Sequence, residues 1–427
     1  MRHDSGDLDD AAGGAAVIED STAELTQHVG EGLAVGADVT ETALRAVDLA
    51  RTGWAGRRPH LACVFVRSSN PSDASRGLRA AAEAIDARTT IGASVSGVLG
   101  SGRRVDNGLA VSVWGAVLPG SRTRGFHLEV MRTGDSLAVI GMPPGTYDDV
   151  LALLLADAGS FPAEQYVETS HEALSGLPVV GGVVAPSKIA GETRLLIDDR
   201  VHERGAVGLV LGGDVRVDLV TAQGAFPIGD PMTVTSTEGS LITGLAGRPA
   251  TAVLHDIVAA LPREQQAIAH DGLHVGVALD EYVDAHGPGG FAIRGVAFAQ
   301  GHQHGALQVD GTVHLGQTVR FHLPDADAAH EELQVRLDRY RELTGSSIAG
   351  ALTITDVGRG DGFFESRDHD IDVIGDRLPG TAAAGLVTQG QIAPSGGRSR
   401  LHTYATTMAI FPTSTRLAPP MGEGPEL

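Results

Sequence analysis

Cysteine is almost absent from this chain, whose 427 residues include only Cys63. A single cysteine excludes an intramolecular disulfide and any metal cluster held by several thiolates. Cys63 lies in the run LACVFV at residues 61–66, which is typical of a buried strand. We therefore expect Cys63 to fill the core as a small hydrophobic side chain rather than to act as a reactive thiol.

Lysine is just as scarce, since Lys188 is the one lysine among 32 basic residues. The 53 acidic residues bring the net charge to −21. A surface that neutralises phosphates needs clustered basic side chains, so we expect neither a nucleic-acid nor a membrane partner. The acidic excess favours solubility and says little about a specific partner.

Long hydrophobic runs are also missing, because no run of about 18 apolar residues occurs, and the sequence predicts no transmembrane span. The first residues are acidic and small, without the charged-then-apolar order of a secretory signal. We expect a soluble, cytoplasmic protein.

The length and composition predict more than one domain. A chain of 427 residues with 42% hydrophobic residues can build two cores. Residues 1–28 are polar and acidic without an apolar period, so we expect a disordered N-terminus. Residues 412–427 are rich in proline and glycine and are expected to form a flexible tail. Between them we expect two domains, residues 29–229 and residues 230–411.

One glycine-rich strand-and-turn phrase recurs along the chain. It reads IGASVSG at residues 91–97, VGGVVAP at residues 180–186 and AGLVTQGQ at residues 384–391. Each copy follows a segment that we expect to be helical and precedes a β-rich stretch. The repetition predicts a chain built from repeated β-α-β-hairpin units.

Apolar periodicity and turn residues predict the elements of three such units. The first has a helix over 39–51, a strand over 61–66, a helix over 74–87 and strands over 90–93 and 109–117. The second has a strand over 136–141, a helix over 147–157 and strands over 179–184, 194–197 and 206–211. The third has a strand over 351–355, a helix near 370–377 and strands over 383–387 and 401–410. Helices over 250–261 and 326–343 flank a less regular region between the second and third units. The predicted fold class is α/β (mixed α+β), with two fused lobes of mixed β-sheet and outer helices.

The first glycine-rich phrase superficially resembles the turn of a serine nucleophile. That turn needs glycine two residues before and two residues after the serine. Ser94 has Gly92 before it but Ser96 after it, and Ser96 has Ser94 before it. We interpret the phrase as a structural turn or a ligand-facing loop, and a catalytic serine stays as the minor alternative. Residues 97–102 lack the Lys-Ser/Thr end of a phosphate-binding loop, so we expect no nucleotide.

Histidine is plentiful, with 17 residues, but no His-Glu-x-x-His pattern occurs. His302 and His304 are two residues apart, which is more typical of a solvated hairpin tip than of a metal or haem site. His322, His330 and His402 are expected at the surface or partly buried. The sequence implies no metal site.

Several phrases in the second half of the chain together resemble the FIST-domain family. They are GAFPIGDPMTVT at residues 224–235, LAGRPA at 245–250, FAIR at 291–294, GAL at 305–307, GQTVRF at 316–321 and GRG at 358–360. The resemblance runs in the family's order through residues 30–411. It implies a FIST N-terminal domain over residues 29–229 and a FIST C-terminal domain over residues 230–411.

The resemblance also implies a function. The family is regarded as an intracellular sensory module of signal transduction that binds small ligands, with amino acids proposed and one branch linked to haem. Ala225 and Asp356 stand where many members carry cysteine, and Gln391 stands where an acidic residue is usual. We therefore expect no cysteine-dependent role and no cofactor, with haem implied only through that branch.

Arg359 is the best candidate for ligand recognition. It follows a predicted buried strand and lies between Gly358 and Gly360, where its guanidinium could hold a carboxylate through two hydrogen bonds. In the alternative interpretation, Arg359 braces its own loop by pairing with Asp356 or Asp361.

The leading hypothesis is a sensory module that binds an amino acid or small carboxylate in a cleft between the lobes. Its predicted ligand-binding residues are Gly92, Ser94, Ser96, Gly97, Arg359, Gly360 and Gln391. The output would pass through a signalling partner or through self-association.

Two other classes stay open. A hydrolase or transferase could use His402 or Asp106 as a base, and an interaction scaffold would have no ligand at all. An open cleft would favour ligand binding, a packed one the scaffold, and a Ser-His pair about 3 Å apart the enzyme.

Overall fold

A computed structural model describes residues 26–414 except 135, 187, 188, 190, 282–289, 300–304 and 346. Most of the predicted disordered N-terminus, nearly all of the predicted flexible tail, and the His302 and His304 pair lie outside the described residues. The first regular element is a strand that begins at His28.

The first repeat matches its predicted order closely. Its elements are β1 (His28–Gly36), α1 (Val39–Arg51), the short 3-10 helix η1 (Thr52–Trp54), β2 (Leu61–Arg67), α2 (Pro71–Ile85), β3 (Thr89–Ser94), β4 (Gly97–Gly100), β5 (Arg103–Val105) and β6 (Leu109–Val117). The cap of α1 is Asp38, whose side chain accepts a hydrogen bond from the Glu41 N–H. Cys63 is fully buried within β2, where burial raises the pKa of its thiol, which agrees with a filling role.

The second repeat contains one wrong prediction. Its elements are β7 (Ser121–Thr133), β8 (Ser136–Ile140), β9 (Asp149–Asp157), α3 (Ala163–Ala173), β10 (Val179–Val184), β11 (Leu195–Ile197), β12 (Arg200–His202) and β13 (Ala206–Gly213). The helix expected over residues 147–157 is the strand β9, which pairs with β10 and β13 in the middle of a sheet. A central strand is covered on both faces, so it shows a continuous apolar run instead of an alternation.

The third repeat is split by an inserted sheet. Its elements are β14 (Asp218–Ala222), α6 (Ala326–Thr344), β22 (Ile348–Asp356), α7 (His369–Arg377), β23 (Ala382–Thr388), β24 (Gln391–Ser395), β25 (Arg398–His402) and β26 (Thr406–Pro412). The helix α6 begins after Asp325, whose carboxylate accepts from the N–H groups of Asp327 and Ala328. The strand predicted over 401–410 is therefore two strands, β25 and β26.

The three repeats share one strand order. The first, last, second and third long strands lie side by side as β1-β6-β2-β3, β7-β13-β9-β10 and β14-β26-β22-β23. In each sheet the second and third long strands in chain order form the parallel pair, β2 with β3, β9 with β10 and β22 with β23. The other pairs of these strands are antiparallel. The structure thus confirms the mixed α/β fold and the repeated β-α-β-hairpin units.

Each repeat gives its hairpin to another repeat. The hairpin β4-β5 of the first repeat extends the sheet of the third, β11-β12 of the second extends the first, and β24-β25 of the third extends the second. The exchange closes a ring of three sheets.

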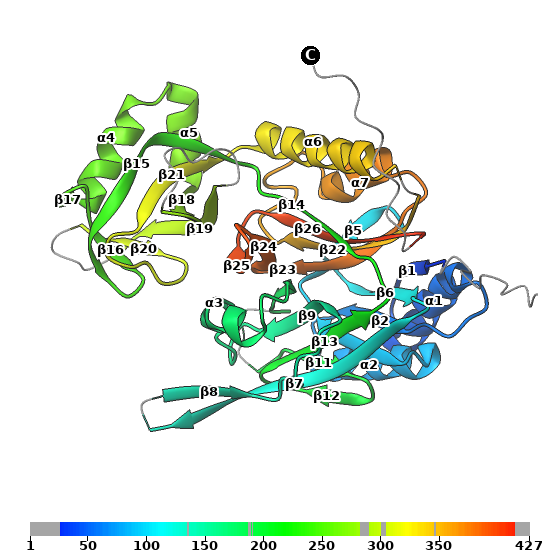
Figure 1. Cartoon of the computed structure of the whole chain (residues 1–427). Coiled ribbons are helices and arrows are strands. Elements are labelled where there is room, and N and C mark those ends of the chain that lie inside the picture. The colour runs from blue at the N-terminus through cyan, green and yellow to red at the C-terminus, as the bar shows by residue number, and fades with distance from the viewer. Residues whose placement is uncertain are drawn as a thin grey trace, which may run out of the picture.

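The inserted sheet forms a separate body to one side of this ring (Figure 1). Its elements are β15 (Ala225–Glu238), β16 (Leu241–Leu245), β17 (Arg248–Pro249), α4 (Ala250–Ala260), α5 (Arg263–Asp271), β18 (Leu273–Ala278), β19 (Phe291–Phe298), β20 (Leu307–Val309) and β21 (Thr318–Pro324). Residues 223–225 and 324–326 connect it to the third repeat. The predicted boundary between residues 229 and 230 falls inside β15, and the division into domains there stays a prediction.

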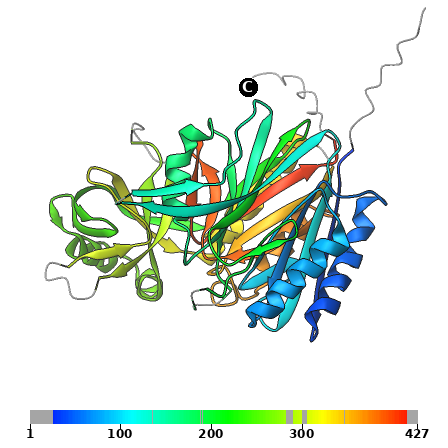
Figure 2. The ribbon, with the colours of Figure 1, turned by 90° about the horizontal axis from the view of Figure 1, so that it is seen from below.

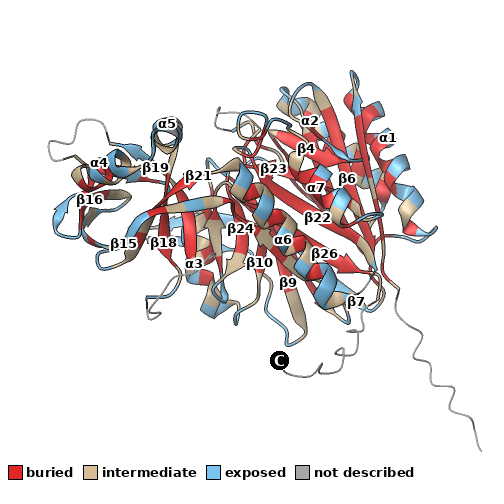
Figure 3. Cartoon of the chain, turned by 90° about the horizontal axis from the view of Figure 1, so that it is seen from above, coloured by how far each residue is buried: buried red, intermediate tan, exposed pale blue. Residues whose placement is uncertain are grey.

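The cores follow from this arrangement. The largest apolar cluster joins inward-facing side chains of all three repeats, among them Phe65, Trp114, Leu153 and Phe411. The helices α1 and α2 cover the outer face of the first sheet (Figure 2), and buried residues fill the strands while the helices expose their outer faces (Figure 3). In the described part of the chain, none of the helices combines the length and the apolar character needed to cross a membrane.

Candidate functional site

A cavity of about 500 Å³ lies at the joint between the inserted sheet and the third repeat. One wall is the chain that leaves β14 and enters β15, residues 223–227, and a second wall comes from β19 and β21. The face of α6 that carries Ala328, Glu331, Glu332 and Val335 closes it. The cavity therefore lies between the inserted sheet and the third repeat, and most of its lining falls within the predicted second domain, so the ligand cleft between the two predicted lobes stays a prediction.

The cavity combines apolar surface with one cation and two carboxylates. Its apolar lining includes Phe226, Phe291 and Val335, and Arg320 and Glu331 add opposite charges. The Arg320 Nε donates to the Gly229 carbonyl, 2.8 Å away, and within the described part of the chain no carboxylate is ion-paired with its guanidinium. Glu331 is exposed and likewise has no ion pair among the described residues. A small zwitterion would meet complementary charges here.

Gln223 is held from three sides at the wall of this cavity. Its N–H and that of Gly224 donate to the Glu332 carboxylate, 3.0 and 2.7 Å away. Its carbonyl accepts from the Arg359 Nη1 at 3.4 Å, and its side-chain amide contacts the His402 Nδ1 at 3.0 Å. The start of the connection to the inserted sheet is therefore fixed by side chains of the third repeat.

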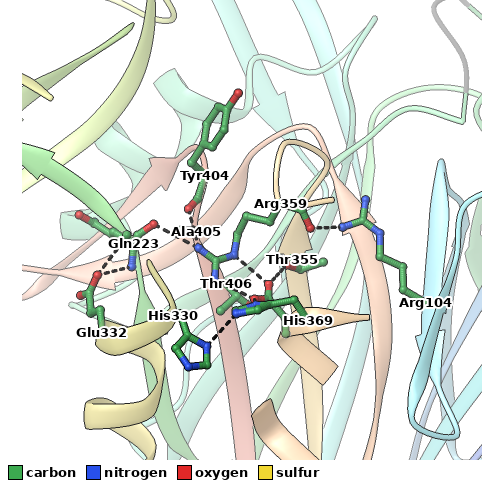
Figure 4. Close-up of polar contacts among 12 residues, drawn as sticks. Arg104, Gln223, His330, Glu332, Thr355, Arg359, His369, Tyr404, Ala405 and Thr406 are labelled. Carbon is green, nitrogen blue, oxygen red and sulfur yellow. Dashed lines mark hydrogen bonds and ion pairs between the residues drawn. The ribbon is translucent and has the colours of Figure 1, made fainter. Parts of the chain in front are cut away.

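Arg359 is the centre of a buried polar network (Figure 4). Its Nε and Nη2 donate to the two carboxylate oxygens of Asp370, 2.8 and 2.7 Å away, and Nη1 also donates to the Tyr404 carbonyl. The side chain of Arg359 is 0% exposed and that of Asp370 is 4% exposed. Arg104, from the exchanged hairpin of the first repeat, donates to the Arg359 carbonyl.

The geometry corrects the expected partner of Arg359. The brace interpretation named Asp356 or Asp361, but the ion pair forms with Asp370 on α7, while Asp361 pairs with Arg367 at the surface. Arg359 does not line the joint cavity, and it contributes there by fixing Gln223. Direct contact between Arg359 and a ligand stays a prediction.

The pKa values of the two buried carboxyls, Asp370 and Asp356, are shifted in opposite directions. Burial alone would raise the pKa of Asp370, but the positive charge of Arg359, together with hydrogen bonds from Arg359, His369 and Thr355, holds it well below its usual range. For Asp356, burial prevails over the N–H groups of Gly358 and Tyr404 and raises the pKa to about 6. Asp370 is thus the permanent anion of the network and Asp356 a group that titrates near neutrality.

A pair of histidines connects Asp370 to α6. The His369 Nδ1 lies 3.0 Å from Asp370, and its Nε2 lies 2.9 Å from the His330 Nδ1. The His369 ring also stacks on Phe364, with centroids 3.5 Å apart.

The partly buried position expected for His330 is correct, whereas His322 and His402 are buried, contrary to expectation. His322 lies on β21 between β15 and β18, and His402 ends the edge strand β25, where Gln223 and Ala393 contact its ring. Burial lowers the pKa of each to about 4.

The first glycine-rich phrase has structural contacts. A Cβ on Gly92 would lie 2.4 Å from the Val64 carbonyl, and a Cβ on Gly97 would lie 2.1 Å from the Asp106 carboxylate. The Ser94 Oγ accepts from the Arg194 N–H at 2.8 Å, and the Ser96 Oγ is buried without a hydrogen-bond partner among the described residues. Neither serine is hydrogen-bonded to a histidine in the described structure, so the arrangement does not favour a catalytic serine.

The remaining predicted residues also lie outside the joint cavity. Gln391 is fully buried, and its side-chain amide donates to the Ala405 carbonyl. Gly360 lies beside Arg104, whose Nη2 would be 3.5 Å from an added Cβ. Asp106 pairs with Arg104 at 2.9 Å. A ligand role for Gly92, Ser94, Ser96, Gly97, Gly360 and Gln391 stays a prediction.

Sequence reasoning missed Arg320, Glu331 and Val335. Val335 is exposed on α6 and lines the cavity. The signal was present in part, because GQTVRF at residues 316–321 and GAFP at 224–227 are phrases of the family resemblance. The order of these phrases in the chain could not predict that they line the same cavity.

The comparison with known families confirms the resemblance. The FIST N domain model matches residues 60–248 and the FIST C domain model matches residues 250–394, so the chain belongs to the FIST-domain family. FIST domains are associated with sensory modules of signal transduction.

Similar proteins include two from mycobacteria. An uncharacterized protein of Mycobacterium tuberculosis strain H37Rv is 36% identical over 385 residues, which cover 90% of this chain and 99% of that protein. An uncharacterized protein of Mycobacterium bovis is 34% identical over 384 residues, which cover 90% of this chain and 98% of that protein. The similarity thus extends over both FIST domains.

Proposed function

We propose that this protein is a cytoplasmic sensory module that binds a small zwitterionic or carboxylate ligand, such as an amino acid, in the joint cavity. The observation that supports this most strongly is the cavity of about 500 Å³ whose walls come from two bodies and whose lining offers Arg320 and Glu331 beside apolar side chains. Arg320 would hold the carboxylate, Glu331 the ammonium group, and Phe226 and Val335 the apolar part.

The same position explains how binding could be sensed. The inserted sheet joins the ring at residues 223–225 and 324–326, and the ligand would touch both bodies at once. Arg294 on β19 is ion-paired with Glu164 and Glu168 on α3, so the inserted sheet also contacts the second repeat. A ligand that binds one arrangement of the bodies better shifts the population toward it, and a signalling partner would read that shift.

A thermal-shift screen tests the proposal. Amino acids and small carboxylates are screened on the wild type, on Arg320→Gln and on Arg45→Gln, which changes an exposed arginine on α1. At a ligand concentration of about 100 times Kd, binding adds about 2.7 kcal/mol to the free energy of unfolding and raises Tm. We expect the shift to be lost in Arg320→Gln and kept in Arg45→Gln.

A second variant tests the volume of the cavity independently of the charge of Arg320. Val335→Trp would fill the space without changing any ionic group, and Val335 is exposed, so the fold should tolerate it. We expect Val335→Trp to abolish the shift as well. A ligand whose shift survives both Arg320→Gln and Val335→Trp would place the binding site elsewhere.

A further inference from the structure

His322 brings a neutral imidazole to the wall of the joint cavity. It lies on β21 and is only 4% exposed, yet it belongs to the lining of the cavity. Its Nδ1 lies 2.9 Å from the Arg320 carbonyl. A carbonyl only accepts, so Nδ1 carries the proton and Nε2 carries the lone pair. Burial lowers the pKa of the ring to about 4, so Nε2 keeps its lone pair at neutral pH.

The Nε2 of His322 is an acceptor without a donor. Among the described residues, none donates a hydrogen bond to it. A buried acceptor that stays unpaired costs free energy. Water can satisfy Nε2 in the empty cavity, but a ligand that displaces this water has to supply the donor itself.

The surroundings of His322 are aromatic and apolar. Gly276 of β18 lies between β19 and β21 and has no side chain, so Phe291 and His322 meet above it. A Cβ added to Gly276 would lie 2.5 Å from the His322 Cε1 and 2.7 Å from the Phe291 Cβ. The two rings meet edge to face with centroids 5.4 Å apart, and Ile293 adds to the apolar lining. This end of the cavity therefore suits an apolar group that carries one donor and no charge.

We propose that the ligand is an aromatic amino acid whose ring carries an O–H or N–H donor, a phenol or an indole, and that His322 selects it. The inference rests on the proposed function, in which Arg320 holds the carboxylate. Glu331 takes the ammonium group, because a charge-assisted hydrogen bond to a carboxylate is stronger than one to a neutral acceptor. The aromatic ring of the ligand lies against Phe291, and its donor meets the His322 Nε2.

Other donor-bearing side chains fit this cavity less well. A serine or threonine side chain is too small to cover the apolar lining, which includes Phe226 and Val335. A lysine or arginine side chain would bring a charge to the end of the cavity where Phe291 and Ile293 lie. A volume of about 500 Å³ lies within the usual range of small-molecule pockets.

Matched pairs of ligands test the donor. Tyrosine and phenylalanine differ by one hydroxyl group, and tryptophan and benzothienylalanine differ by an N–H group in place of a sulfur atom. In titration calorimetry on the wild type, we expect the donor-bearing member of at least one pair to bind at least about tenfold more tightly, because its partner leaves the buried Nε2 unpaired.

Two substitutions separate the acceptor of His322 from its packing. His322→Phe keeps an aromatic ring but removes the acceptor, and the preference within the pair should fall to about twofold or less. His322→Gln places an amide oxygen near the position of Nε2 and should keep the preference. Circular dichroism confirms that each variant is folded. A merely structural role of His322 would weaken both ligands of a pair equally and leave their ratio unchanged.

The outcomes distinguish this inference from the proposed function. If no amino acid binds, or if binding survives both Arg320→Gln and Val335→Trp, the proposed function is wrong and the inference falls with it. If binding needs Arg320 but the affinities are equal within both pairs, the inference alone is overturned. A preference that persists in a folded His322→Phe would likewise overturn it, and the wild-type comparison depends on no variant.

Discussion

Arg359 and Asp370 form a two-point ion pair that is closed off from solvent and connects the loop after β22 to the first turn of α7. Thr355 and His369 add hydrogen bonds to the same carboxylate at 2.6 and 3.0 Å. Removal of one partner of such a pair leaves a buried charge without compensation.

Asp370→Asn should therefore lower the free energy of unfolding by about 3 to 5 kcal/mol. The matched control is Asp361→Asn, whose partner Arg367 lies at the surface, and it should cost less than about 1 kcal/mol. Urea unfolding at pH 7.5 measures both. A loss of under about 1 kcal/mol in a folded Asp370→Asn would mean that the pair contributes little to stability.

His402 should make the protein sensitive to acid. Burial lowers its pKa to about 4 from 6.5, and its Nδ1 and Nε2 contact Gln223 and Ala393. The unfolded chain binds the proton first as the pH falls, so this stability is complete above pH 6.5 and is lost toward pH 4. Between pH 7 and pH 4 the urea midpoint should fall less steeply with pH in His402→Gln than in the wild type. In His255→Gln, whose side chain is exposed, the midpoint should fall as steeply as in the wild type. Equal slopes in all three proteins would remove His402 from the acid response.

Asp356 should have the opposite pH dependence. Its pKa is raised to about 6 in the fold from 3.8, so its contribution is fully present below pH 3.8 and is lost as the pH rises through 6. The shift of about two pKa units corresponds to about 3 kcal/mol at pH 7.5. Asp356→Asn keeps an oxygen acceptor for the N–H of Gly358 and should be more stable than the wild type at pH 7.5, with the difference shrinking toward pH 4.5. A variant that is less stable at pH 7.5 would show that the fold needs the ionised carboxylate.

Gly92 separates a structural role from a ligand role. A Cβ there would press on the Val64 carbonyl at 2.4 Å, so Gly92→Ala should lower the free energy of unfolding by about 1 to 3 kcal/mol. Gly375 lies on α7 with nothing within 4 Å of an added Cβ, and Gly375→Ala should raise it by about 0.5 to 1 kcal/mol. Thermal unfolding compares the two. If Gly92→Ala unfolds like the wild type but loses ligand binding, the predicted pocket at the glycine-rich phrase would gain support.

The repeats could be predicted because their signals are local. The helix predicted over residues 39–51 has the bounds of α1, since its apolar period lies within one segment. The helix predicted over residues 147–157 is wrong because the apolar run over 150–156 has no period, and such a run fits a central strand as well as a buried helix. The strand β15 went unnoticed because Pro227 and Pro231 interrupt it, and its pairing with β21 slips between Ile228 and Met232.

The candidate site could be predicted only in part, because its contacts are not local. The partner of Arg359 lies eleven residues further on, on a helix that folds back over the loop, whereas Asp356 and Asp361 were nearer in sequence. The joint cavity combines residues of β15, β19, β21 and α6, which are separated along the chain by up to about a hundred residues. Phrases of the family resemblance marked two of its walls but could not show that they face each other.

The exchange of hairpins ties the last part of the chain to the first. Gly97, Val98 and Leu99 pair with β23, whose residues are synthesised almost three hundred positions later. The ring therefore cannot close during synthesis until nearly the whole chain has left the ribosome. A chain that ends before β23 leaves the sheet of the second repeat without β24 and β25, and it leaves the hairpin β4-β5 without a sheet to join. The three repeats therefore depend on one another for folding.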